Sequence, residues 1–118
     1  MKIVRMLPFL DSEEIDELLE LLINDELKEE SLSISSILPF LHREQVKKLF
    51  DKSLEGNIAI KPVCILPFLQ DEELDELVDK IIDEETEALK VDELLPFLNK
   101  KQIQKLFKDA INNSKKEV

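Results

Sequence analysis

The chain has 118 residues and a formal net charge of −11; 43% of its residues are hydrophobic and 36% are charged. This length is enough for one domain with a hydrophobic core, and the charge disfavours generic attraction to nucleic acids or anionic membranes. One glycine and five prolines are too few turn formers for a hairpin-rich β fold. We therefore expect a single all-α domain over residues 1–118.

The motif Leu-Pro-Phe-Leu (LPFL) occurs four times, at spacings of 31, 28 and 29 residues. Regular spacing in this range is typical of stacked supersecondary units. We expect four helix–corner–helix repeats, at about 3–26, 34–55, 62–85 and 91–113, that form a short α-solenoid or a compact helical bundle. The motif residues are Leu7, Pro8, Phe9, Leu10, Leu38, Pro39, Phe40, Leu41, Leu66, Pro67, Phe68, Leu69, Leu95, Pro96, Phe97 and Leu98.

Each position of LPFL has a predicted structural role. Proline fits the first turn of a short helix or 3₁₀ turn, and we expect the first leucine and the phenylalanine to enter the core. The last leucine precedes a polar residue, which is followed three positions later by Glu or Gln. This order predicts a hydrophobic staple and a capping box. We expect good boxes at Asp11–Glu14 and Asn99–Gln102, and poor caps at His42 and Gln70.

A longer amphipathic helix is predicted after each motif, and its charge alternates along the chain. Residues 11–26 contain eight acidic residues and no basic ones, whereas 42–55 contain four basic and three acidic residues. Residues 70–85 are again acidic and 99–111 basic. We expect two similar halves, 1–58 and 59–118, in which an acidic helix lies beside a basic one; drift within four equal repeats explains the alternation less well. The tail at 112–118 is expected to be frayed.

No set of residues with catalytic chemistry is recognisable, so we expect no enzyme, no cofactor and no metal site. His42 and Cys64 are the only histidine and cysteine, and structural zinc needs three or four such ligands. The single cysteine excludes an internal disulfide and favours a reducing cytoplasm. Because Met1 leads directly into the first repeat and no long apolar run follows, we expect neither a signal peptide nor a membrane span.

The pattern Leu-Pro-x-Leu-x-x-Glu-Glu-Leu-x-x-Leu, written in full at residues 66–77, resembles the helical repeats of HEAT and armadillo proteins and of small bacterial α-solenoid domains. This resemblance implies a scaffold that binds proteins or peptides. Our first hypothesis is a cytoplasmic adaptor or regulator without catalytic activity that binds a protein partner and also self-associates into a homo-oligomer. The candidate partner-binding residues are Glu13, Glu17, Glu20, Leu21, Lys48, Lys101 and Lys105.

The alternative hypothesis is a transcriptional regulator that binds nucleic acid through lysine-rich helices in repeats two and four. Its candidate residues are Lys47, Lys48, Lys100, Lys101 and Lys105. Lysines gathered on one open face would favour this alternative, whereas lysines paired with the acidic helices would favour the adaptor. The net charge of −11 and the nearby carboxylates argue against phosphate binding.

Overall fold

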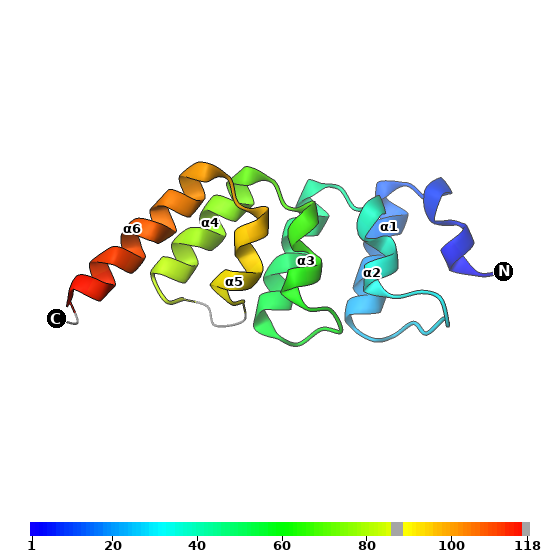
Figure 1. Cartoon of the computed structure of the whole chain (residues 1–118). Coiled ribbons are helices and arrows are strands. Elements are labelled where there is room, and N and C mark those ends of the chain that lie inside the picture. The colour runs from blue at the N-terminus through cyan, green and yellow to red at the C-terminus, as the bar shows by residue number, and fades with distance from the viewer. Residues whose placement is uncertain (86–88, 117–118) are drawn as a thin grey trace. The chain divides into compact units, whose positions relative to one another are not determined.

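The computed structural model describes residues 1–85 and 89–116, and within these ranges the chain is all-α, as predicted (Figure 1). The described residues form no strand, and they contain one isolated antiparallel bridge between Glu29 and Leu32. The elements are η1 (Ile3–Arg5), η2 (Leu7–Phe9), α1 (Ser12–Ile23), α2 (Ile34–Ile37), η3 (Leu38–Phe40), α3 (Arg43–Glu55), η4 (Pro62–Cys64), η5 (Leu66–Phe68), α4 (Asp71–Ile82), α5 (Val91–Leu94), η6 (Leu95–Phe97) and α6 (Lys100–Lys116), where η denotes a 3₁₀ helix.

The elements group into two compact units, which divide after Phe68. In the first unit α1, α2, η3 and α3 follow one another, and in the second α4, α5, η6 and α6 do so. The division comes later than the predicted one at 58/59. The reason is that η4 contacts α3 and η5 contacts η4, which joins residues 62–68 to the first unit.

The acidic helices α1 and α4 end in the same way. After α1, Asp25 adopts a positive φ of 55°, and after α4 Glu84 adopts a φ of 58°. In both places the following amide donates to the carbonyl five residues back, from Glu26 to Leu21 at 2.9 Å and from Glu85 to Lys80 at 2.8 Å. This is the Schellman termination, formed here without glycine. The basic helix α3 is instead capped by Gly56, which has a φ of 79°.

The LPFL motif is a 3₁₀ turn in every copy, with proline in its first turn as predicted. The first leucine is buried in three copies, but Leu95 is 37% exposed. The expectation that the phenylalanines enter the core is wrong. Phe9, Phe40 and Phe68 are exposed and Phe97 is half-buried. Because a 3₁₀ helix has three residues per turn, a leucine pointing inward directs the residue two positions later to another side.

The capping boxes form more widely than predicted. As expected, the Asp11 side chain accepts a hydrogen bond from the Glu14 backbone amide at 2.8 Å, and the Glu14 side chain accepts one from the Asp11 amide at 3.1 Å. Asn99 and Gln102 form the same reciprocal pair. His42 also caps its helix, contrary to expectation, because Nδ1 of a neutral imidazole accepts a hydrogen bond. The backbone amide of Gln45 donates to this atom at 3.4 Å. Gln70 makes no side-chain cap, as predicted.

The last leucine of LPFL and its staple partner are covered to different degrees along the chain. Leu69 is buried, whereas the other three last leucines are half-buried. The partners Ile15, Val46 and Leu74 are buried, but Ile103 is 41% exposed. The predicted fraying from residue 112 is also wrong, because α6 continues to Lys116; residues 117–118 lie outside the described ranges.

Candidate protein-interaction surfaces

In the first unit, the acidic helix α1 and the basic helix α3 are joined by polar contacts. The Gln45 side chain is only 4% exposed, and its Nε2 donates to the Ser12 carbonyl at 3.2 Å. Further along the two helices, the Lys48 ammonium forms an ion pair with Glu20. The hydrogen bond from Lys48 to Glu20 is the main reason why the pKa of Lys48 is raised.

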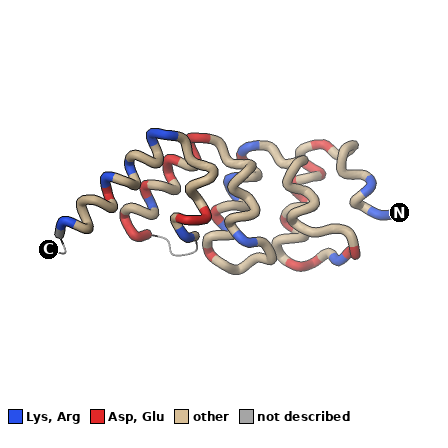
Figure 2. Tube along the Cα trace, in the orientation of Figure 1, with Lys and Arg blue, Asp and Glu red and all other residues tan. Residues whose placement is uncertain are grey.

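The second unit repeats these contacts at the same positions, counted from LPFL. Gln102 Nε2 donates to the Asp71 carbonyl at 3.1 Å, and also to Asp75 Oδ1 at 2.6 Å. Lys105 pairs with Asp79, and this hydrogen bond is the main cause of its raised pKa. The prediction that acidic and basic helices are neighbours is therefore confirmed within each unit, and Figure 2 shows the charged positions along them.

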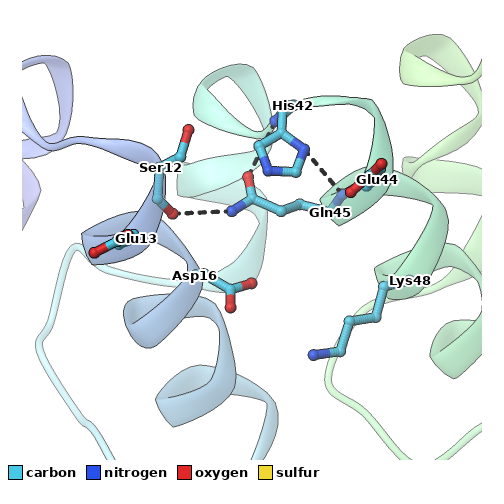
Figure 3. A pocket seen from close by; sticks show the side chains of 7 residues that line it. All are labelled: Ser12, Glu13, Asp16, His42, Glu44, Gln45 and Lys48. Atoms are coloured by element: carbon cyan, nitrogen blue, oxygen red, sulfur yellow. Dashed lines mark hydrogen bonds between the residues drawn. The ribbon is translucent and has the colours of Figure 1, made fainter.

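A shallow pocket of about 320 Å³ lies between α1 and α3 (Figure 3). Its polar groups are mainly engaged in local structure. The His42 ring caps α3, and the side-chain amide of Gln45 joins α3 to α1. The pocket is lined by Ser12, Glu13, Asp16, His42, Glu44, Gln45 and Lys48. Among residues 1–85 and 89–116, no three His, Cys, Asp or Glu side chains gather closely enough to hold a metal ion.

The predicted partner-binding residues lie in both units. Glu13 lines the pocket of Figure 3, while Glu20 and Lys48 pair with each other. Glu17 and Lys101 are exposed on their helices, and Leu21 is half-buried. Lys105 is engaged by Asp79 in the second unit. Glu20, Lys48 and Lys105 thus take part in the helix pairs, and the partner-binding role of the set stays a prediction.

An exposed apolar face on α6 is absent from that predicted set. Phe107 is 63% exposed, Ile103 41% and Ile111 37%. These three residues recur every four positions and so lie on one side of the helix. A shallow pocket of about 340 Å³ on this side is lined by Phe107, Ala110, Ile111, Ser114 and Lys115. We call Ile103, Phe107 and Ile111 the α6 face.

Residues at the same positions in α3 are covered. Val46 and Phe50, which correspond to Ile103 and Phe107, are each 5% exposed, and Leu54 is half-buried. Both helices have the apolar spacing that is typical of a face packed against a core, but in α6 this face is exposed. No signal within the helix distinguishes the two, because the stripes have the same spacing. In the first unit α3 also contacts η4, the short helix that follows it.

A second uncovered apolar region lies at residues 1–10. Met6 is 39% exposed, although Ile65, its counterpart before the third LPFL, is fully buried. Phe9 is 86% exposed, against 40% for Phe68. The segment is held in place by Glu29, which accepts hydrogen bonds from the amides of Ile3 at 2.9 Å and Val4 at 3.1 Å. The bond from Ile3 is the main reason why the pKa of Glu29 is lowered.

Comparisons with protein-family models, with curated proteins and with solved structures found no match to this chain. The likeness to HEAT and armadillo repeats therefore rests on the LPFL pattern and remains a prediction. None of the helices within the described residues has both the length and the apolar character needed to cross a membrane.

Proposed function

We propose that the chain is a protein–protein interaction module without catalytic activity, a small cytoplasmic adaptor or regulator built from HEAT-like or armadillo-like helical repeats. The observation that carries this proposal is the α6 face. Phe107 is 63% exposed, whereas Phe50 at the same position of α3 is 5% exposed. An aromatic residue flanked by two isoleucines on an open helix face is typical of the anchor of a protein interface.

The lysines support a protein partner more than a nucleic acid. Lys48 and Lys105 form ion pairs with the acidic helices, so part of their charge is already compensated. Clustered, uncompensated lysines would be needed to follow a phosphate backbone. The other charged residues of α6, mainly lysines, lie on the same helix as the exposed apolar face. Such a helix suits a partner that combines apolar side chains with carboxylates.

A pull-down from cells that naturally contain the chain tests this function. Wild type, Phe107→Ser and Phe40→Ser serve as baits, at low and at high salt and after nuclease treatment. Phe40 is 39% exposed and lies in η3, so its variant controls for loss of an exposed ring. We expect proteins that bind wild type and Phe40→Ser but not Phe107→Ser. Capture that is unaffected by Phe107→Ser, or that is lost with nuclease, would contradict the proposal.

A further inference from the structure

We infer that the partner of the α6 face is residues 1–10 of a second copy of this chain, so that copies associate head to tail. The inference rests on the proposed function, because it names the occupant of the same face. It follows from a contact that the chain makes within its own first unit.

That internal contact joins a basic helix to the segment of the next repeat. Within the first unit, η4 contacts α3. The segment that contains η4 and η5, residues 62–68, carries Ile65 and Leu66, which are 0% and 1% exposed. On the helix, Val46 and Phe50 are each 5% exposed. The molecule therefore contains a contact between a basic helix with a buried apolar face and the η segment that follows it.

The chain also contains each partner of this contact in an uncovered form. Residues 3–9 (IVRMLPF) align on LPFL with residues 62–68 (PVCILPF), and both segments form two consecutive 3₁₀ turns. In the N-terminal segment Met6 and Phe9 are open, and on α6 Ile103 and Phe107 are open. The uncovered residues of the N-terminal segment thus correspond to the segment at 62–68, and the uncovered face of α6 corresponds to that of α3. A contact between two copies would cover both.

Charge favours the same pairing. The N-terminal segment leads directly into residues 11–26, which contain eight acidic residues and no basic ones. The helix α6 contains six lysines and one aspartate. Docking residues 1–10 on α6 would bring an acidic helix near a basic one. It would also continue the acidic–basic order that Lys48–Glu20 and Lys105–Asp79 show within the units.

The segment is ordered before it binds. Glu29 accepts hydrogen bonds from the Ile3 and Val4 amides, so η1 does not have to be immobilised on association, which lowers the entropic cost. The contact joins two different surfaces, so each copy keeps one surface free. Such heterologous contacts extend into rings or open chains of copies.

The test measures association of the purified 118-residue chain by sedimentation and by size-exclusion chromatography with light scattering, over a range of concentrations. Wild type should form dimers and larger species as concentration rises, less so at high salt. The double variant M6S/F9S removes the segment surface, and Phe107→Ser removes the α6 face. Each variant alone should bind itself at least about tenfold more weakly than wild type, whereas Phe40→Ser should associate like wild type.

Mixing the two defective proteins gives the decisive result. M6S/F9S retains its α6 face and Phe107→Ser retains its segment, so an equimolar mixture should form a 1:1 dimer and nothing larger. Circular dichroism checks that each variant is folded. Wild type that stays monomeric, or a mixture that forms no dimer although wild type associates, overturns the inference; so does association of M6S/F9S as strong as that of wild type, since it would mean that α6 faces pair with each other.

The failure of this inference can be told apart from failure of the proposed function. If the chain is monomeric but still captures proteins through Phe107 in the pull-down, the proposed function stands and the self-association is contradicted. If the chain is monomeric and its captured proteins do not depend on Phe107, both the proposed function and the self-association are contradicted.

Discussion

The helices α3 and α6 carry the same apolar stripe, yet one is covered and the other is open. Phe50 is 5% exposed in α3, and Phe107 is 63% exposed at the same position of α6. The two helices agree in their capping boxes, in the buried glutamine at N3 and in the lysine that pairs with the acidic neighbour. The local sequence therefore specifies that each helix forms and that it pairs with an acidic helix.

The two helices differ in the elements beside them. After α3 the chain continues into η4, which contacts it. An amphipathic pattern states that a face is apolar and does not state what will cover it, because burial is a property of the assembled structure. The difference between α3 and α6 is thus a difference in context, and substitutions at equivalent positions can measure it.

The largest expected effect comes from removing the two rings. Phe50→Ala should lower the free energy of unfolding by about 3–5 kcal/mol, because it removes a buried ring and leaves a cavity. Phe107→Ala should change it by no more than about 0.5 kcal/mol, since the ring is mainly in solvent. Urea unfolding followed by circular dichroism measures both. The measurements are made on dilute protein, so that association does not contribute. Equal losses for the two variants would contradict the difference in burial.

A smaller effect is expected where the two units agree. Gln45→Glu and Gln102→Glu keep the side-chain oxygen that caps the helix, and remove the Nε2 donor to the carbonyls of Ser12 and Asp71. We expect losses of about 1–3 kcal/mol, because a buried side chain loses a hydrogen bond and gains a charge. Gln102→Glu should cost more, since Gln102 also donates to Asp75 Oδ1 and a carboxylate there would repel it.

The same unfolding assay at neutral pH measures both variants. Gln45→Glu is the matched control for Gln102→Glu, because both variants keep the capping oxygen and lose the Nε2 donor to a carbonyl. If Gln102→Glu cost no more than Gln45→Glu, repulsion by Asp75 would not be part of the loss.

Much of the fold could be predicted from the sequence because its signals are local. The LPFL spacing marks the short 3₁₀ turns, and the charge alternation identifies the helix pairs later joined by Lys48–Glu20 and Lys105–Asp79. The errors have physical causes of two kinds. Apolar character favours a core position for Phe9 and its equivalents, although three residues per turn direct them outward. By residue type His42 is a poor cap, although its Nδ1 accepts the hydrogen bond.

The candidate site was harder to predict than the fold. The residues chosen from sequence were mainly charged, and several of them form the internal helix pairs. The α6 face was missed because its stripe matches that of α3, and only the absence of a covering element among the described residues makes it a surface. The N-terminal segment was missed for the same reason, since Met6 and Ile65 occupy equivalent positions and differ in their surroundings.

The smallest expected effect concerns how the segment at 1–10 is held, compared with its counterpart η4. The segment depends on the Glu29 carboxylate, whose pKa is lowered from its ordinary value of 4.5 chiefly by the hydrogen bond from Ile3. A group whose pKa is lower in the folded state stabilises that state above the unfolded pKa. Its contribution is lost as pH falls through the folded pKa. We therefore expect the amide signals of Ile3 and Val4 to titrate together, with a midpoint below 4.5.

An NMR titration of the isotope-labelled chain from neutral to acidic pH measures this midpoint. Glu29→Gln is the control, because its amide keeps an acceptor oxygen but does not titrate in this range, so the shared transition should disappear from Ile3 and Val4. Its persistence would show that another group governs the segment. The amides of Cys64 and Ile65 in the counterpart donate to backbone carbonyls at 3.0 Å. They should not follow the Glu29 titration, which would limit the pH response to the segment that we propose binds a second copy.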